Sequence, residues 1–340
     1  MRSANFLRGL ACLALLLVCT TGAKAQGDPL YDLAQPGTLY MNQQFGTSPS
    51  MAVFNNEIYI AYQANDGSHN TMITTSSDGV NFSTPVRYSY LQTHSATGPV
   101  ITNWNGLLWL AYTGVDGYVY LASSSNGIDF FGSTGGAPTP VIDPAGEQQP
   151  ANSQPTLAVY NGLLWITAEW NGPGSQTYME TNTTQNGSTF TGANYCYLGP
   201  DGEMPQTGAA IGMAVYNNLL YFAFQSQGNW GHNLVVCSSN GATNGPVTNN
   251  VYSNLQVGSG LSATAYNGSL YLAYKDRSGN NDLTIAESTD GVTFESNVYT
   301  GIQINGNQQL NPSTTVFNSL FYLTHVSNDS GHRMYLTNNQ

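Results

Sequence analysis

One short phrase, an aromatic residue followed by asparagine at the start of a tight turn, recurs six times along the chain of 340 residues. The six copies are Val53-Phe54-Asn55, Asn103-Trp104-Asn105, Val159-Tyr160-Asn161, Val215-Tyr216-Asn217, Ala265-Tyr266-Asn267 and Val316-Phe317-Asn318. Their asparagines lie 50, 56, 56, 50 and 51 residues apart. Such regular spacing indicates a chain assembled from copies of one supersecondary unit, and this constrains the fold more than any other feature.

A strand-like run rich in β-branched and aromatic residues follows each copy. The runs are Ile58–Tyr62, Leu108–Tyr112, Leu164–Thr167, Leu220–Phe224, Leu270–Tyr274 and Phe321–Thr324. They are apolar on both faces, as expected for strands buried between neighbouring sheets. A repeat of about 50 residues with four short strands is typical of a β-propeller. The sequence therefore predicts an all-β fold, a six-bladed β-propeller of four-stranded antiparallel blades.

The two ends of the chain indicate how such a ring closes. The sixth unit stops at Gln340, directly after its third strand, whereas the segment 37–44 precedes the first unit without a partner. Gln43-Gln44 before Pro49-Ser50 resembles Gln308-Gln309 before Pro312-Ser313. We therefore expect the N-terminal strand to complete the last blade, because pairing removes two free strand edges.

The first 25 residues have the features of a secretory signal. Arg2 and Arg8 precede the apolar stretch 10–18, and Ala23-Lys24-Ala25 is a small-x-small cleavage site. The apolar stretch is shorter than the roughly 20 residues that span a bilayer, which disfavours an uncleaved anchor. The prediction is a signal peptide at 1–25, one propeller domain at 26–340, and a secreted protein, extracellular or periplasmic, without membrane attachment after cleavage.

Charge excludes one class of partner. Lys and Arg number 7 against 19 Asp and Glu, so the net charge is −12. Nucleic-acid binding needs clustered cations to neutralise phosphates, and we expect none here. Anionic polymers are disfavoured for the same reason, which leaves neutral or amino sugars as possible ligands.

A second repeated motif follows the predicted third strands. Its clearest copies are Ser76-Ser77-Asp78-Gly79-Val80-Asn81-Phe82 and Ser288-Thr289-Asp290-Gly291-Val292-Thr293-Phe294, and looser copies start at Ser124, Thr184 and Ser238. Asp or Asn accepts backbone N–H groups inside a turn, and Gly supplies the left-handed residue. Because nearly every unit has the motif, we interpret it as structural.

This motif resembles the Asp-box, or BNR repeat, of the sialidase superfamily of six-bladed propellers. The copies here are one residue shorter between Asp and the aromatic residue, and the fourth has lost its Phe. The resemblance implies the fold, with the boxes on the face away from the active site. It also implies that sialidase activity would need three arginines on the substrate carboxylate. Only Arg87, Arg277 and Arg333 follow the signal, and Arg87 falls in an outermost strand, so we do not expect that triad.

The opposite face gathers the connections from fourth to first strands and from second to third strands. Amide, charged and aromatic side chains of these connections form our candidate ligand site: Trp170, Trp230, Gln225, Lys275, Arg277 and His325. Sugar hydroxyls need directional hydrogen-bond partners, and the C–H face of a sugar stacks on aromatic rings. The simpler interpretation is a solvated loop face.

Carboxylates on the same face keep an enzymatic function open. Glycoside cleavage requires two carboxylates at a suitable separation. Glu169 and Glu203 are the best candidates, and Asp276 is held ionised if the flanking Lys275 and Arg277 stay charged. Each of the three is equally well explained as an ordinary surface acid.

No metal site is expected. His69, His232 and His332 occupy matching places in separate units, which disfavours a shared metal, and no zinc-type spacing occurs. Acidic loops could bind Ca2+ through oxygen atoms, but they lack the ligand order of an EF-hand, so no cofactor is predicted. Cys196 and Cys237 remain after signal cleavage, either bridged or as two free thiols.

These features favour a secreted, non-catalytic, lectin-like propeller with a glycan ligand. A glycoside hydrolase or lyase of the sialidase superfamily is the alternative, and an extracellular protein-interaction scaffold is a third interpretation. The sugar and the oligomeric state do not follow from the sequence.

Overall fold

The computed structural model describes residues 38–44, 47–94, 97–143, 145–171, 177–193, 205–206, 208–227, 231–241, 247–277, 279–305, 310–328 and 333–339. Within these ranges the chain forms 24 strands and no helix. It follows that the described segments offer no helix long and apolar enough to cross a membrane. The predicted signal peptide at 1–25 lies outside the described residues.

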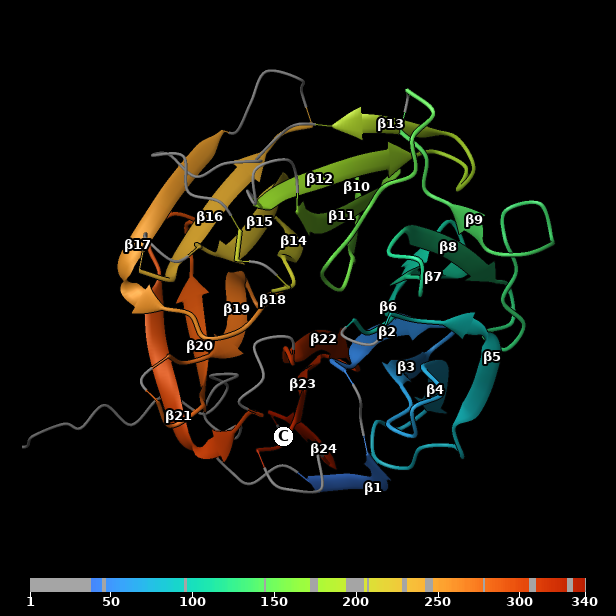
Figure 1. The fold of residues 1–340 in the computed structure, drawn as a ribbon. Helices are drawn as coiled ribbons and strands as arrows, with labels where there is room; N and C mark the ends of the chain where they lie inside the picture. The colour runs from blue at the N-terminus through green and yellow to red at the C-terminus, as the bar shows by residue number, and fades with distance from the viewer. Residues whose placement is uncertain are drawn as a thin grey trace, which may run out of the picture.

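The strands form six four-stranded antiparallel sheets arranged around a central axis (Figure 1). Blade 1 is β2 (Ser50–Phe54), β3 (Glu57–Gln63), β4 (Asn70–Ser76) and β5 (Val86–Gln92); blade 2 is β6 (Val100–Trp104), β7 (Leu107–Thr113), β8 (Val119–Ser124) and β9 (Thr139–Pro140). Blade 3 is β10 (Thr156–Tyr160), β11 (Leu163–Asn171), β12 (Thr177–Thr184) and β13 (Phe190–Ala193); blade 4 is β14 (Gly212–Tyr216), β15 (Leu219–Gln225), β16 (Asn233–Ser239) and β17 (Thr248–Gln256). Blade 5 is β18 (Ser262–Tyr266), β19 (Ser269–Lys275), β20 (Asp282–Ser288) and β21 (Glu295–Gln303). The six-bladed β-propeller predicted from the repeat is confirmed.

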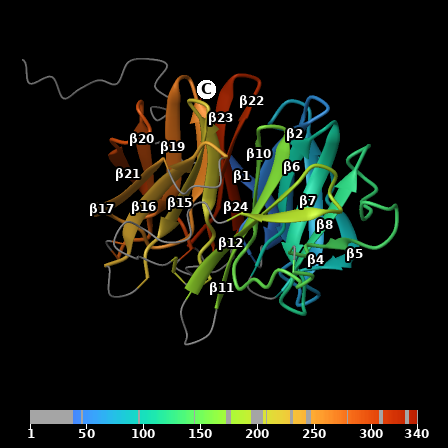
Figure 2. The same ribbon diagram turned by 90° about the horizontal axis from the view of Figure 1, so that it is seen from above.

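Blade 6 closes the ring in the predicted way. It consists of β22 (Ser313–Phe317), β23 (Leu320–Val326), β24 (Arg333–Asn338) and the N-terminal strand β1 (Thr38–Gln44), in the order β1-β24-β23-β22. Strand β1 is antiparallel to β24, with Thr38 opposite Leu336. The inner strands β22 and β2 are also in contact, so the first and last blades meet near the axis (Figures 1 and 2).

Apolar side chains on both faces of each sheet explain why six sheets form a ring. The buried apolar residues of the described chain fall into six clusters, and each cluster joins two neighbouring blades. Blade 6, for example, packs Val326 and Met334 against Ile60 and Met72 of blade 1. A four-stranded sheet with two apolar faces cannot bury both alone, so every blade needs two neighbours.

The asparagine of the repeated phrase is explained by backbone geometry. All six copies place Asn in the left-handed region between the first and second strands, for example Asn55 at φ 49° and Asn318 at φ 50°. The next residue also has a positive φ, as in Gly106 at 71°. A two-residue turn of this type matches the twist of antiparallel strands and requires residues that tolerate positive φ.

Candidate functional site

The inner strand of each blade pairs on one side only, so its second edge of backbone N–H and C=O groups faces the axis. Hydroxyl side chains at the first strand position bind part of this edge. Ser313 Oγ accepts the N–H of Met51 at 3.1 Å, Ser50 Oγ accepts that of Ile101 at 3.1 Å, and Ser262 Oγ accepts that of Thr314 at 3.0 Å. Each bond connects one blade to the next. It also gives a partner to a backbone N–H group, and such a group is costly when it is buried without one. Blade 3 uses Thr156, whose hydroxyl donates to the Ile211 carbonyl.

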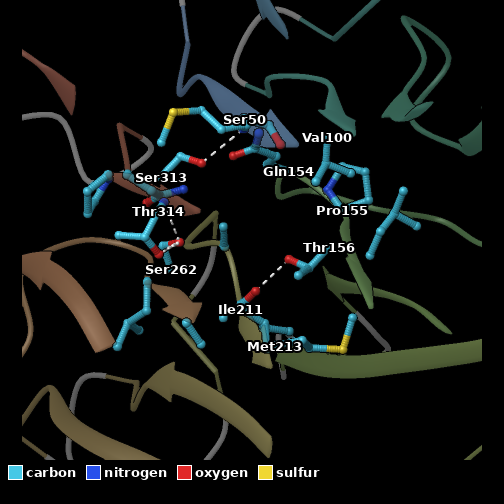
Figure 3. Close-up of a pocket in the computed structure, with 18 of the residues that line it drawn as sticks. Ser50, Val100, Gln154, Pro155, Thr156, Ile211, Met213, Ser262, Ser313 and Thr314 are labelled. Carbon is cyan, nitrogen blue, oxygen red and sulfur yellow. Dashed lines mark hydrogen bonds between the residues drawn. The ribbon is translucent and has the colours of Figure 1, made fainter. Parts of the chain in front are cut away.

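A pocket of about 150 Å³ lies on the axis where the six inner strands begin. All six blades contribute to its wall (Figure 3). The described residues that line it include no charged side chain and no aromatic ring. We call this cavity the axial pocket.

The wall of the axial pocket mixes polar and apolar side chains. In Figure 3, Ser262, Ser313 and Thr314 lie on one side, whereas Thr156 lies with Val100 and Pro155 on the opposite side. The Ser262 and Thr314 hydroxyl oxygens lie 2.8 Å apart. The arrangement offers a small neutral molecule both directional hydrogen bonds and van der Waals contacts.

The candidate residues from the sequence occupy a different layer. Glu169, Gln225 and Lys275 hold the same position, seven residues into the second strand of blades 3, 4 and 5. The side chains of Glu169 and Gln225 reach the connection that leads into the next blade. None of the three lines the axial pocket.

Glu169 is fully buried. Its Oε2 accepts the N–H of Gly208 at 2.8 Å, and its Oε1 has no hydrogen-bond partner among the residues that the structure describes. Burial raises the pKa of this carboxyl to about 7, while the hydrogen bond from Gly208 opposes the rise. Its backbone N–H donates to Ser153 Oγ at 3.1 Å. Glu169 therefore connects blade 3 to the segment that leads into blade 4.

Gln225 and Lys275 are buried in a similar way. Gln225 Nε2 donates to the Val257 carbonyl at 2.7 Å and lies 2.7 Å from His232 Nδ1. Lys275 is 4% exposed, and burial lowers the pKa of its ammonium. The Lys275 backbone N–H donates to Ser259 Oγ at 3.1 Å, as that of Glu169 does to Ser153.

The remaining described candidates belong to blades 5 and 6. His325 is buried in β23 and stacks on Tyr335 with ring centroids 5.7 Å apart, and burial lowers the pKa of its imidazole to about 4. Asp276 is half-buried directly after β19, and its backbone N–H donates to the Asp282 carbonyl at 2.8 Å. Arg277 is exposed.

Several predictions fall on parts that the structure does not describe. Glu203, Trp230, His332 and Cys196 lie outside the described residues. Trp170 belongs to β11, where its backbone pairs with that of Tyr178. Cys237 is buried and disulfide-bonded, and its partner lies outside the described residues.

The Ser-x-Asp-Gly turns lie at the far end of the blades, where third strands finish. In blade 1, Asp78 Oδ1 accepts the backbone N–H groups of Val80 at 2.8 Å and Asn81 at 2.7 Å, and Ser76 Oγ accepts that of Gly79 at 2.9 Å. These bonds lower the pKa of the Asp78 carboxyl below its usual range. The motif therefore forms a self-contained turn.

The matching histidines have a backbone explanation. His69 and His232 have φ values of 56° and 58°, and their carbonyls accept the N–H groups of Thr93 and Val257 at 2.9 Å. Asn281 holds the equivalent position in blade 5 at φ 59°. Among the described residues no group of three His, Cys, Asp or Glu side chains could hold a metal ion.

The arginine that the sequence assigned to an outermost strand is found in β5. Arg87 Nη2 lies 2.6 Å from Asp66 Oδ2, and Arg87 Nη1 donates to Ser68 Oγ at 3.1 Å. Both partners lie on the surface of blade 1, outside the lining of the axial pocket.

Comparison with known proteins agrees with the fold. No protein-family model matches the chain, and no curated protein matches its sequence. An α-L-arabinanase of Penicillium chrysogenum in complex with arabinobiose has a TM-score of 0.61 and 13% identity, covering 89% of this chain and 95% of that one. The Aleuria aurantia lectin in complex with Fucα1-6GlcNAc has a TM-score of 0.59 and 11% identity over 87% and 96%. The Trypanosoma rangeli sialidase in complex with the inhibitor DANA has a TM-score of 0.58 and 12% identity over 86% and 54%. At identities this low, the structural similarity shows a shared fold and nothing further.

Sequence reasoning missed the residues of the axial pocket. The Pro49-Ser50 and Pro312-Ser313 pairs served to align the two ends of the chain, yet they also line the pocket. Aligning the residues just before the first strand of every blade would have found the residues that line the pocket, because equivalent positions in the six blades lie at the same height along the axis. No single residue among them signals a site alone.

Proposed function

We propose that this chain is a secreted, non-catalytic carbohydrate-binding protein whose axial pocket takes one neutral sugar unit. The observation on which the proposal rests is the described lining of that pocket, which combines hydroxyl and amide groups with apolar side chains and includes no charged side chain. Its volume of about 150 Å³ is below the 300–1,000 Å³ typical of drug-sized ligands. A single small ring is therefore the expected occupant.

A neutral sugar suits this mixed lining. Its hydroxyls can pair with Ser50, Ser313 and the amide of Gln154, and its C–H groups can pack on Leu157 and Met213. An anionic sugar would enter without a cation to compensate its desolvation, which is strongly unfavourable. The ligand class is thus neutral saccharides.

The comparisons support a carbohydrate ligand without separating a lectin from an enzyme. Among the similar folds, an arabinanase and a lectin are both described in complexes with saccharides. The pocket of this chain favours binding, because a glycosidase needs two carboxylates at the reacting bond and the described residues that line the axial pocket include none. Trp170, Trp230 and Arg277 are our candidates for contacts with further sugar units outside it.

Binding by the secreted protein to an array of neutral glycans, followed by calorimetry, tests the proposal. Thr102 lines the pocket and is half-buried, so Thr102→Trp should fill the cavity and abolish binding. Val80→Trp, at an exposed turn position outside the pocket lining, is the matched control and should bind as the wild type does. Unchanged binding in Thr102→Trp, or no glycan binding by the wild type, would refute the axial site.

Glycoside cleavage is the second candidate function, favoured by one observation. A buried carboxyl with its pKa raised to about 7, as in Glu169, has the protonation behaviour of a general acid. Glu203 would be its partner. Hydrolysis of aryl glycosides that is lost in Glu169→Gln, with the fold intact, would support this function over pure binding.

A further inference from the structure

Six residues hold the equivalent position in the six blades, two residues before each inner strand, and three of them, Gln154, Ala210 and Asn311, line the axial pocket. The six are Ser48, Gly98, Gln154, Ala210, Gly260 and Asn311. Four of them are small, and the two amides belong to blades 3 and 6, which lie opposite each other in a six-bladed ring.

The two amides differ in their hydrogen bonding. Gln154 Nε2 donates to the Pro99 carbonyl at 2.9 Å. Asn311 is 3% exposed, and within the described ranges neither its Oδ1 nor its Nδ2 has a hydrogen-bond partner. The backbone of Asn311 is fixed, because its N–H donates to Ser48 Oγ. Its side chain extends over Gly260, where an added Cβ would clash with Asn311 Oδ1.

An unpartnered buried amide is unfavourable, because both its donor and its acceptor have lost water without a replacement. Native structures satisfy nearly all such groups, and exceptions occur where function uses them. Asn311 lines the axial pocket, so a molecule in that pocket can supply both partners. Apolar residues of similar size would fill the same space without this disadvantage.

We propose that Asn311 is the specificity-determining residue of the axial pocket and recognises two adjacent hydroxyls of a neutral sugar. An amide presents one acceptor and two donors side by side. One hydroxyl of a vicinal pair donates to Oδ1 while its neighbour accepts from Nδ2. Gly260 leaves the room that the Asn311 carboxamide needs. This inference rests on the proposed carbohydrate binding and names the part of the sugar that is recognised.

The first test uses methyl glycosides of glucose, galactose, mannose and arabinose with their monodeoxy analogues, titrated by calorimetry. Removing either hydroxyl of the recognised pair should weaken binding about tenfold, since a lost hydrogen bond of about 1.4 kcal/mol equals a factor of ten. Removal of the other hydroxyls should change affinity less. In Asn311→Leu, the parent sugar should bind about tenfold or more weakly and the difference between parent and deoxy sugars should vanish.

The second readout needs no ligand. Asn311→Leu replaces an unpaired amide with an apolar group of similar size, so the midpoint of thermal unfolding should rise. Gln154→Leu is the matched control in the opposite blade. Its midpoint should fall, because the wild-type amide already donates to Pro99 and its loss leaves that carbonyl unpaired.

The outcomes separate this inference from the proposed function. If the sugars bind but no deoxy analogue is weakened, or if Asn311→Leu binds with full affinity, water alone satisfies Asn311 and only the inference is overturned. A lower unfolding midpoint in Asn311→Leu with intact sugar binding assigns the amide a structural role and also overturns it. If no methyl glycoside and no array glycan binds, both the inference and the proposed function are wrong.

Discussion

The phenol oxygen of Tyr59 in blade 1 lies against Gly127 of blade 2, in the space that a side chain at Gly127 would fill. Equivalent contacts join Gly187 to Trp109, Gly291 to Tyr221 and Gly79 to Tyr322. Each glycine belongs to a Ser-x-Asp-Gly turn or its looser copy, and each aromatic residue belongs to the second strand of the preceding blade. The turn motif therefore also serves as a docking point between blades.

Gly127→Ala should destabilise the protein markedly, because φ is +76° and the new Cβ overlaps the Tyr59 ring. Left-handed backbone costs about 1–2 kcal/mol for a non-glycine residue, and overpacking adds about 1–3 kcal/mol. Gly106→Ala is the control, since its φ is +71° and nothing lies within 4 Å of the added Cβ. Urea unfolding should show a loss in Gly127→Ala larger by at least about 1 kcal/mol. Equal losses would disprove the docking role.

The tyrosine of the repeated phrase makes a second contact between blades. Tyr216 Oη donates towards the Gly268 carbonyl at 2.8 Å and the Thr289 carbonyl at 2.6 Å, both in blade 5. Tyr216→Phe should therefore lower the free energy of unfolding by about 1 kcal/mol, because two carbonyls of blade 5 lose their donor. Tyr90→Phe is the control, because Tyr90 is 54% exposed and its hydrogen bond to the Phe130 carbonyl is longer, at 3.2 Å, so that this variant should lose at most about 0.5 kcal/mol. Similar losses in both variants, measured by denaturant titration, would contradict this assignment.

The sequence predicts the fold well because the repeated turns need particular residue types, which can be recognised without the structure. Asn55 and its equivalents adopt positive φ in a two-residue turn, and this requirement is visible in the residue type. Ring closure was equally visible, because the last unit lacked one strand and segment 37–44 had no partner. The role of Trp104 in donating Nε1–H to the Gly162 carbonyl of the next blade has no such local signal.

The candidate site was harder to predict because residue type does not reveal burial. Gln225 and Lys275 look like surface residues of a loop face, yet both are buried at the ends of their strands. Gln225 donates to the Val257 carbonyl, and the backbone N–H of Lys275 donates to Ser259 Oγ. Asn311 is one of many asparagines in the chain, and only the ring geometry places it at the axis. The position of Asn311 at the axis depends on how all six blades pack together, and this packing cannot be read from the residues near Asn311.

Glu169 should make stability depend on pH. Its pKa is about 7 in the folded protein against 4.5 in the unfolded chain, so the folded state binds the proton more tightly. Stability from this group is full below pH 4.5 and declines as pH rises towards 7, by about 3 kcal/mol in total. Glu169→Gln keeps an oxygen for the Gly208 N–H and removes the charge. The variant should be more stable than the wild type at pH 8, and the two should converge at pH 4.5.

His325 changes stability in the opposite direction, so the comparison must be made between variants. Its pKa is about 4 when folded against 6.5 when unfolded, and stability from this group is therefore lost as pH falls from 6.5 to 4. Because wild type and Glu169→Gln share His325, subtracting their unfolding free energies at each pH cancels its effect. A difference that stays constant between pH 4.5 and 8 would show that Glu169 does not titrate in this range.

The disulfide of Cys237 should link it to Cys196, because the other two cysteines, Cys12 and Cys19, fall within the predicted signal peptide. Such a bridge closes a loop between positions 41 residues apart and should stabilise the protein by about 2–4 kcal/mol. Peptide mapping of the secreted, unreduced protein should give one cross-linked pair that contains both residues. Cys196→Ser should lower the unfolding free energy as much as Cys237→Ser, and the double variant should lose little more than either. A free thiol at Cys196 in the secreted protein would contradict this pairing.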